Sequence, residues 1–482
     1  MSVNSYLGKR GYTIYKESVE ERIIAEMREE LFVKPFVPKS VIKPSAFPIY
    51  RENSKKMFLP RFYGEQRFGK AKKKHIGEGL TININFNGGL RDYQENIAQK
   101  YMKNVNEGKG GGLLEVDTGM GKTVIALNIL SRVKKKTLII VHKEFLLEQW
   151  IERITQFIPD ARVGKIQGKT QDVDDKDICI GMLQSLSMKN YDENIFEDFG
   201  MMIIDEVHHM GAEVFSQALL KVVCNNVLGL SATMERKDGL TKVFKMFCGN
   251  IIHTERRDTS SNKVLIKAVN YISEDEEFNA MMYNFKGDPA YSSMVGKLCK
   301  NIDRSNFILK ILIDILKNGD GLQIMILAHN KNILKYLYES IVERKIGNAD
   351  VGYYVGGMKK EDLKESEDKK IIVATYAMAS EGLDIKTLTT LIMATPKSDV
   401  VQVVGRILRT NHGKAMVVDV IDGHEIFQRQ YYTRRRFYNK QKYEIVRSSN
   451  VDYKDVKDEE EEDEEEKKKP VNQVCLFDEI IE

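Results

Sequence analysis

The segment Val116–Thr123, VDTGMGKT, decides the fold that this sequence predicts. It follows a short apolar run, GGLLEV (111–116), and leads into TVIALNILSRV (123–133), whose pattern predicts a helix. A strand, a glycine-rich loop and a helix in this order are typical of a phosphate-binding loop. Glycines let backbone N–H groups point at phosphate oxygens, and the helix N-terminus adds partial positive charge. Val116 stands where the general pattern has its first glycine, so the loop alone also fits an ordinary glycine-rich turn.

Two side chains of this loop have the chemistry that a nucleoside triphosphate requires. We expect Lys122 to bridge the β- and γ-phosphates and the Thr123 hydroxyl to ligate Mg²⁺. The other residues expected to cradle the phosphates are Thr118, Gly119, Met120 and Gly121.

Two adjacent carboxylates, Asp205 and Glu206, end the apolar run GMMII (200–204). A carboxylate at the end of a buried strand can hold Mg²⁺ opposite a phosphate-binding loop. A second one beside it can orient and deprotonate the water that attacks the γ-phosphate. The sequence therefore predicts a metal site at Thr123 and Asp205, with Glu206 as the general base.

The segment QVVGRILR (402–409) places Gln402, Arg406 and Arg409 on one face of a predicted helix, at spacings of four and three residues. Two guanidinium groups and an amide in one stripe require anionic partners, and bound phosphates would serve. We expect Arg406 and Arg409 to act as arginine fingers that neutralise the transferring phosphoryl group. An exposed basic helix face is the alternative that this pattern leaves open.

Short apolar runs recur in both halves of the chain. In the first half they are GGLLEV (111–116), KTLIIV (136–141), DICIGM (177–182), GMMIID (200–205) and NVLGLSA (226–232). In the second half they are LQIMILA (322–328), KKIIVAT (369–375), TTLIMAT (389–395) and KAMVVDV (414–420). Near-continuous apolar runs suit strands that are buried on both faces. The sequence therefore predicts an α/β fold with two tandem parallel-sheet domains, 81–252 and 253–445.

The two ends of the chain differ from these domains. Residues 1–80 contain five of the nine prolines and the basic stretch GKAKKKH (69–75), and predict a small α+β accessory domain, with a structural lid as the alternative. Residues 424–443 predict a helix that interleaves aromatic and basic side chains, which either grips nucleic acid or packs on the second domain. Residues 446–482, with nine consecutive acids at 458–466, predict a disordered acidic tail.

Charge and composition narrow the class of protein. The net charge of +4 divides into −9 on residues 458–482 and +13 on the rest, which fits a polyanion partner or simply a solvated tail. No apolar stretch is long enough to cross a membrane, the N-terminus has no secretory pattern, and the five cysteines show no C-x-x-C spacing. We expect an intracellular protein, in the cytoplasm or in a virion, without a membrane partner.

Taken together, the motifs resemble those of superfamily 2 helicases of the DEAD/DEAH type. TGMGKT (118–123), DEVH (205–208), SAT (231–233) and QVVGRILR (402–409) are similar to motifs I, II, III and VI of that family, in the same order. Its other motifs are matched by LRDYQ (90–94), LIIVHKEFLLEQW (138–150), IGMLQSLS (180–187), LAHNKN (327–332) and ATYAMASEGLDI (374–385). The resemblance implies two RecA-like domains that hydrolyse ATP with Mg²⁺ and act on nucleic acid.

The resemblance also implies roles for further residues. Arg91 and Gln94 would bind adenine, while Gly382 and Asp384 would approach the γ-phosphate and the ribose or a finger arginine. The residues that would couple the nucleotide state to nucleic acid are His208, Ser231 and Thr233. Candidate contacts to a nucleic-acid strand are Lys143, Phe145, Ser185, Ser187 and Thr375.

Within the superfamily, VGKIQGKTQ (163–171) and LSATMERKDGL (230–240) resemble the XPB-like branch most. The closest similarity is to the poxvirus-type transcript-release helicases of large DNA viruses and phages. This resemblance implies a DNA substrate, 3′-to-5′ movement, and a role in viral transcription termination, repair or recombination. Arg236-Lys237-Asp238 matches only in part the Arg-Glu-Asp element that this branch uses in duplex opening.

Three functions stay open at this point. The first is a helicase, the second is a duplex-DNA translocase that displaces RNA or protein without unwinding, and the third is a polymerase-associated subunit with a spent ATPase. QVCLF (473–477) resembles the peptide that docks on sliding clamps, so a sliding clamp is one candidate partner. RNA polymerase is the other, because the family resemblance implies a role in transcription. Docking of this segment on the body of the protein is the alternative.

Overall fold

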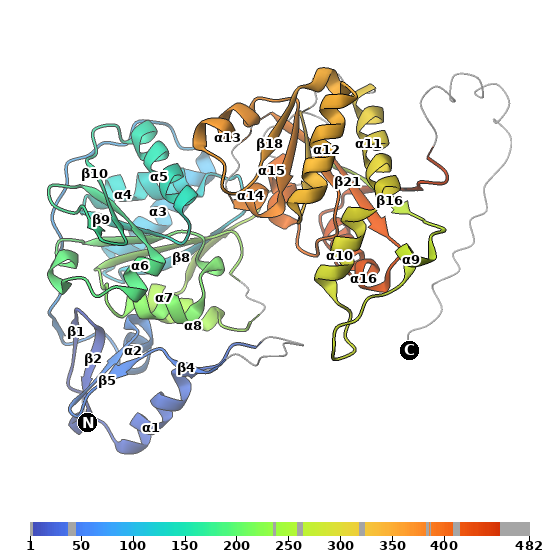
Figure 1. The fold of residues 1–482 in the computed structure, drawn as a ribbon. Helices are drawn as coiled ribbons and strands as arrows, with labels where there is room; N and C mark the ends of the chain where they lie inside the picture. Colours follow the sequence, from blue (N-terminus) through green and yellow to red (C-terminus); the bar gives the residue numbers. More distant parts are fainter. Residues whose placement is uncertain are drawn as a thin grey trace. The chain divides into compact units, whose positions relative to one another are not determined.

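A computed structural model of the chain describes residues 3–36, 45–234, 238–257, 264–317, 323–381, 385, 387–407 and 415–453. The chain divides into two compact units, residues 1–258 and 259–482 (Figure 1). Among the helices of the described ranges, none combines the length and the apolar character that a bilayer crossing requires. The expected acidic tail from residue 454 onward, including residues 473–477, lies outside the described residues.

The first unit begins with a small α+β region, as the sequence predicted. Its sheet has the strand order β5-β6-β2-β1-β7, antiparallel except where β7 joins β1. The elements are β1 (Ser5–Gly8), β2 (Gly11–Tyr15), α1 (Glu21–Glu30), β5 (Arg51–Glu52), β6 (Lys56–Leu59), α2 (Arg61–Phe68) and β7 (Lys73–Lys74), with a separate ribbon of β3 (Phe32–Val33) and β4 (Phe47–Pro48).

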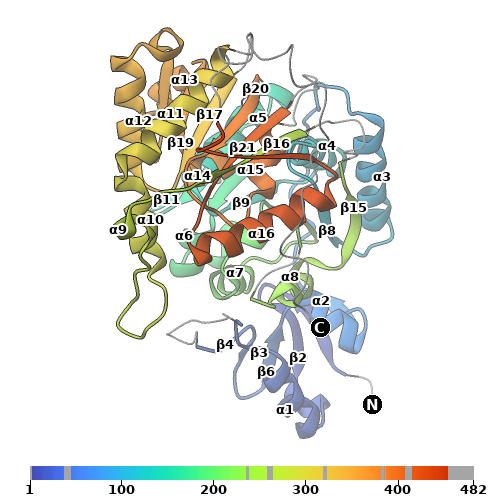
Figure 2. The same cartoon turned by 90° about the vertical axis from the view of Figure 1, so that its right-hand side faces the viewer.

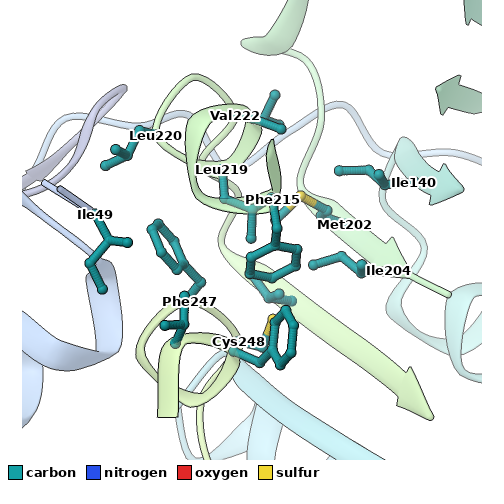
Figure 3. Close-up of a cluster of buried hydrophobic side chains, with 14 of the residues drawn as sticks. Ile49, Ile140, Met202, Ile204, Phe215, Leu219, Leu220, Val222, Phe247 and Cys248 are labelled. Carbon is teal, nitrogen blue, oxygen red and sulfur yellow. The ribbon is translucent and has the colours of Figure 1, made fainter. Parts of the chain in front are cut away.

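This region packs on the larger sheet of the same unit. Ile49 meets Leu220 and Phe247 in a buried cluster (Figure 3). Burial of each such side chain contributes about 1.5–3 kcal/mol. Arg61 completes the junction, because its guanidinium donates to the carbonyl oxygens of Cys224 (3.1 Å) and Asn225 (2.7 Å). Residues 1–80 are therefore built into the first unit.

The larger sheet has eight strands in the order β11-β10-β12-β9-β13-β14-β8-β15, all parallel except β11. The strands are β8 (Gly111–Val116), β9 (Thr137–Val141), β10 (Val163–Gln167), β11 (Thr170–Gln171), β12 (Ile178–Met182), β13 (Met201–Ile204), β14 (Asn226–Ser231) and β15 (Ile251–Glu255). The helices are α3 (Asp92–Asn106), α4 (Lys122–Val133), α5 (Glu144–Phe157), α6 (Leu183–Met188), α7 (Ala212–Leu219) and α8 (Thr241–Cys248).

Both faces of this sheet are buried, which explains the continuous apolar runs. Side chains alternate along each strand, so Ile203 packs with α3, α4 and α5 while Ile204 packs with α6, α7 and α8. The five strands predicted in this half are confirmed.

The second unit has a seven-stranded parallel sheet in the order β18-β19-β17-β20-β21-β16-β22. Its strands are β16 (Val264–Tyr271), β17 (Gln323–Ala328), β18 (Val351–Tyr354), β19 (Ile371–Thr375), β20 (Leu388–Met393), β21 (Ala415–Asp422) and β22 (Glu444–Ser449). Its helices are α9 (Glu276–Asn279), α10 (Tyr291–Lys300), α11 (Ile302–Lys317), α12 (Lys331–Glu343), α13 (Lys360–Glu367), α14 (Tyr376–Glu381), α15 (Val401–Ile407) and α16 (Glu425–Lys440). Helices α10, α11 and α12 cover one face, and α14 and α15 cover the other (Figure 2).

Two expected boundaries differ from the structure. Strand β15 pairs with β8, so the first sheet continues past residue 252, and the first unit ends at residue 258. Strand β22 pairs with β16, so residues 446–449 belong to the second sheet rather than to a tail. Both strands lie at sheet edges, where one side of a strand is unpaired and the apolar pattern is weaker.

Helix α16 confirms the helix predicted at 424–443, but one of its arginines is not solvated. Arg434 is 1% exposed and forms two hydrogen bonds with Asp419, at 2.7 and 2.8 Å. Tyr438 donates a third hydrogen bond to the same carboxylate at 3.1 Å. Arg434 therefore holds α16 on the sheet, whereas Arg436 is exposed.

We predict that Arg434→Leu lowers the free energy of unfolding by about 3–5 kcal/mol, because it leaves the Asp419 carboxylate buried without its counter-charge. Urea unfolding of the full chain measures this change. The matched control Arg436→Leu should change the free energy by less than about 0.5 kcal/mol. Equal unfolding midpoints for the two variants would contradict the assignment.

Candidate nucleotide-binding site

The loop between β8 and α4 has the backbone that a phosphate cradle requires. Gly119 (φ 80°) and Gly121 (φ 83°) both adopt left-handed conformations that favour glycine. A Cβ atom at residue 121 would lie 2.5 Å from Nε2 of Gln94. The turn therefore accepts only glycine at this position without a shift of Gln94.

Lys122, the first residue of α4, lies beside one of the predicted carboxylates. Its Nζ atom is 3.4 Å from Oε1 of Glu206 and 3.4 Å from the carbonyl oxygen of Val116. The lysine side chain is only 10% exposed, so its charge is directed into the loop. The structure thus brings Lys122 and Glu206 together from positions far apart in the sequence.

Asp205 is buried at the carboxyl end of β13. Its Oδ2 atom accepts a hydrogen bond from Nε1 of Trp150 (2.9 Å), and its Oδ1 atom accepts one from the backbone N–H of Glu206 (2.9 Å). Burial, and next the charge of Glu206, raise the pKa of Asp205 to about 6, while the Trp150 hydrogen bond acts in the opposite direction. Burial and the neighbouring charge disfavour the ionised form of Asp205, so a bound cation would stabilise it.

The oxygen donors of this site fit Mg²⁺. Mg²⁺ prefers hard oxygen ligands and commonly takes one or two from the protein and the rest from phosphates and water. The Asp205 carboxylate and the Thr123 hydroxyl are such donors. Within the described part of the chain, no group of three or more His, Cys, Asp and Glu side chains could hold a metal by itself. An ion here would therefore need further oxygen ligands, which phosphates at the loop would supply.

A row of polar contacts leads from Glu206 to the end of β14. Glu206 has a left-handed backbone (φ 47°, ψ 51°), a strained conformation for a residue with a side chain. Its Oε2 atom is 3.4 Å from Nδ1 of His208, which is 2.7 Å from Oγ of Ser231. The Ser231 hydroxyl accepts a hydrogen bond from the backbone N–H of Thr233 at 3.3 Å. The three expected coupling residues are thus linked to the expected general base.

Gln94 holds the phosphate-binding loop. Its Oε1 atom accepts from the backbone N–H of Arg91 (3.0 Å), and its Nε2 atom donates to the carbonyl oxygen of Met120 (3.0 Å). Tyr93 donates its hydroxyl to the same Met120 oxygen at 3.0 Å. Gln94 therefore contacts the loop directly, with its amide oxygen and nitrogen both bonded to the backbone, and Arg91 is joined to the loop through Gln94.

The expected strand contacts of the first unit lie at the same carboxyl edge of the sheet, in different environments. Lys143 lies 6.0 Å from the ring centre of Phe145, at the start of α5. The Ser185 hydroxyl accepts a hydrogen bond from the backbone N–H of Gly168 at 2.9 Å. Ser187 is 5% exposed and donates to Gln217 at 2.9 Å, so its hydroxyl supports the fold rather than facing solvent.

The expected residues of the second unit are only partly described. Thr375 ends β19, and Gln402 lies in α15 and is half-buried. Arg406 belongs to α15, but its side chain is outside the described residues, as are Gly382, Asp384 and Arg409. The element expected at 236–238 is represented by Asp238 alone, which accepts a hydrogen bond from the backbone N–H of Leu240 (3.1 Å).

The sequence did not point to two groups of the site. One is Trp150, whose partner Asp205 is 55 residues away. The other is Arg256, which forms ion pairs with Glu115 (2.8 Å) and Asp117 (2.9 Å) at the base of the loop. Only the pairing of β15 with β8 brings Arg256 to this position, so no local pattern could have revealed it.

Comparisons with known proteins match both halves of the chain. A family model described as "Type III restriction enzyme, res subunit" matches residues 87–236, and one described as "Helicase conserved C-terminal domain" matches residues 308–411. A protein of Acanthamoeba polyphaga mimivirus that carries the name of an ATP-dependent RNA helicase is 35% identical over 457 residues, which cover 92% of this chain and 87% of that protein.

Two further similarities agree with this match. A similarly named protein of African swine fever virus (strain Badajoz 1971 Vero-adapted) is 27% identical over 384 residues, 75% of this chain and 74% of that protein. A solved fragment named as an HsdR subunit of a type I restriction enzyme from Vibrio vulnificus YJ016 has a TM-score of 0.52 and 19% identity, covering 76% of this chain and 69% of that one. At this identity the structure supports the fold alone.

We predict that Mg-ATP changes the intrinsic fluorescence of the protein. Trp150 is the one tryptophan of the chain, and its indole N–H bonds the carboxylate that a cation would approach. A fluorescence titration of the wild type should therefore give a saturable signal. Lys122→Ala should abolish the signal at the same nucleotide concentrations. A signal of equal size in that variant would place the nucleotide elsewhere.

Proposed function

This chain belongs to the superfamily 2 helicases, which hydrolyse ATP, and on that premise we propose that it is a motor that moves along DNA. The observation that carries the ATP-hydrolysing part of the proposal is the 3.4 Å approach of Lys122 to Glu206 beside the buried Asp205. A cation from a phosphate-binding loop and two carboxylates at a strand end are the parts that phosphoryl transfer to water needs.

In the proposed mechanism each residue has a distinct role. Lys122 and the backbone of Thr118–Gly121 would bind the phosphates, and Gln94 together with Arg91 would bind the adenine. Thr123 and Asp205 would hold Mg²⁺, which would neutralise charge on the phosphates. Glu206 orients the attacking water and accepts its proton.

Arrival of the γ-phosphate would draw Lys122 toward it and away from Glu206. Glu206 is linked to His208 and Ser231, so a change at the carboxylate reaches the end of β14 through direct contacts. The strained backbone of Glu206 makes this segment suited to two alternative arrangements. We propose that His208, Ser231 and Thr233 couple hydrolysis to movement in this way.

The second unit would supply the remaining groups of the site, which are assigned from its sequence motifs. Arg406 and Arg409 would neutralise the charge that develops on the transferring phosphoryl group, and Gln402 belongs to the same sequence motif. Gly382 and Asp384 would approach the γ-phosphate and the ribose. Thr375, together with Lys143, Phe145 and Ser185, would contact the backbone of one strand.

DNA is the leading substrate and RNA is the second candidate. The XPB-like pattern at 163–171 and 230–240 supports DNA, as does the restriction-enzyme name of the family model. The viral relatives carry the name of RNA helicases, which supports RNA. ATPase activity measured in parallel with single-stranded DNA, duplex DNA and RNA decides between them. Stimulation by RNA alone would overturn the DNA proposal.

Unwinding and translocation without unwinding are separated by a second pair of assays. Displacement of a triplex strand without displacement of a duplex strand would identify a translocase that removes RNA or protein from DNA. Displacement of both would identify a helicase. A role in viral transcription termination, with RNA polymerase or a sliding clamp as partner, extends this proposal through the segment 473–477.

We predict that Lys122→Ala lowers kcat for ATP hydrolysis by at least about 100-fold, because the lysine stabilises charge that develops on the phosphates. Glu206→Gln should lower kcat by a factor on the order of 100–10,000 while ATP still binds. A phosphate-release assay with saturating nucleic acid measures both. Lys169→Ala, at an exposed turn, serves as the control. Wild-type turnover in Lys122→Ala would refute the site.

We predict that Ser231→Ala lowers the number of strands displaced per ATP hydrolysed by about tenfold, the equivalent of one hydrogen bond of about 1.4 kcal/mol. The reason is that Ser231 joins His208 to Thr233. ATPase and strand displacement are measured on the same sample. An unchanged ratio of the two rates would show that this contact does not couple them.

A further inference from the structure

A cavity of about 930 Å³ lies in the first unit, at the opposite end of the sheet from the phosphate-binding loop. Its lining comes from α2, α3, α8 and β15, which follow one another down one side of the unit in Figure 2. Gly111, the first residue of β8, lines the cavity, whereas Val116, the last, leads to the loop. At ~3.3 Å per residue the two places are about 17 Å apart. The cavity is therefore separate from the nucleotide site.

Lysines dominate the rim of this cavity. Two come from α3 and two from α8, in each case three residues apart, and two flank the helices α2 and α3. They are Lys70, Lys100, Lys103, Lys109, Lys242 and Lys245, all exposed, and together they are named the lysine pocket. Like charges three residues apart on a helix repel each other. Two helices that both direct such a pair into one hollow therefore favour an anion between them.

The two carboxylates that line the pocket do not neutralise it. Glu65 is paired with Arg61 at 2.8 Å, and Glu107 is paired with Lys109 at 2.7 Å. Lys100 lies 2.9 Å from Nδ1 of His253. Among the residues that the structure describes, none brings a carboxylate within ion-pair distance, 4.0 Å, of the remaining four lysines, Lys70, Lys103, Lys242 and Lys245. Glu30 and Glu107 act on Lys242 and Lys103 only from a greater distance.

The floor of the pocket is partly apolar. Phe62, Met246 and Ile251 line it together with the lysines. Low-dielectric walls beneath a concave array of one charge focus the potential and strengthen attraction for an opposite charge. The hollow is also held rigidly, because Arg61 fastens α2 to the loop at Cys224 and Asn225.

We propose that the lysine pocket binds the phosphodiester backbone of the nucleic acid on which the motor acts, as a second contact away from the nucleotide edge of the sheet. This inference rests on the proposed function. A hollow of this size, ringed by lysines of α3 and α8 and of the segments that follow α2 and α3, exceeds what a single phosphate needs. Lysine gives point charges without the fork that reads base edges, so the contact is independent of sequence.

The basic stretch 69–75 supports a backbone rather than a small anion. Lys70 lines the pocket, and Lys73, three residues further along the chain, is exposed in strand β7, whereas Lys74 is paired with Glu78 at 2.9 Å. Exposed lysines that extend beyond the pocket suit a chain of phosphates better than a free nucleotide.

The test reverses the charge of three lysines that have no carboxylate partner. The variant Lys103→Glu/Lys242→Glu/Lys245→Glu is compared with Lys34→Glu/Lys55→Glu/Lys286→Glu, which makes the same change in net charge at exposed positions outside the pocket. Fluorescence anisotropy with a labelled DNA duplex and a labelled single strand measures Kd over a series of salt concentrations. Urea unfolding confirms that both variants are folded.

We expect the pocket variant to bind at least about tenfold more weakly and to lower the slope of log Kd against log salt concentration by about 3, one unit for each lost phosphate contact. The control variant should keep the wild-type slope. If all three proteins bind with the same affinity and slope, the pocket proposal is overturned while the proposed function stands. If the wild type binds no nucleic acid at all, the proposed function is overturned, and the pocket proposal is overturned with it.

A peptide of residues 458–466 supplies the competing outcome, since nine consecutive acids could also occupy the pocket. Binding of this peptide to the wild type but not to the pocket variant, with nucleic-acid affinity unchanged, would overturn the proposal in favour of an acidic-peptide site.

Discussion

The buried carboxylate of Asp205 is the constraint on which the first unit depends. A charge at the end of a buried strand needs hydrogen bonds, and Trp150 and the backbone of Glu206 supply them. The Trp150 bond fixes α5 against β13, and the turn that presents the Glu206 N–H leaves that residue in a left-handed conformation. The same turn carries the Glu206 side chain to Lys122. The hydrogen bonds of the buried Asp205 carboxylate thus determine both where the Glu206 side chain lies and the left-handed backbone of that residue.

Much of the fold could be predicted because parallel strands buried on both faces leave continuous apolar runs. The nine predicted strands are present, and the loop 116–123 joins a strand to a helix as expected. Strands β10 and β15 were missed because apolar and polar residues are mixed along them, as Lys165 and His253 show. Strands β11, β16, β18 and β22 were also not predicted. All six lie at an edge of their sheet or next to one, where a strand is defined more by its partners than by its own sequence.

The residues of the candidate site that stand in short motifs could be picked out from the sequence, whereas those that depend on tertiary pairing could not. Lys122, Asp205 and Glu206 stand in short motifs, so the sequence indicated them. Arg434 is an example of what the sequence does not show. The residue type alone does not tell a buried arginine from an exposed one, and Arg434 is buried because it pairs with Asp419 of β21. For the same reason, the sequence around residues 70, 103 and 245 gave no indication that these lysines line one pocket.

The junction around Ile49 and Arg61 has a consequence for how such chains diversify. Leu219 and Leu220 at the end of α7 and Phe247 of α8 form part of the apolar surface on which Ile49 of the leading region packs. A shortened chain that starts after the leading region would expose this surface to water, which favours self-association. A leading region exchanged between relatives would therefore need matching apolar residues in α7 and α8. We expect the residues on the two sides of this junction to change together in evolution.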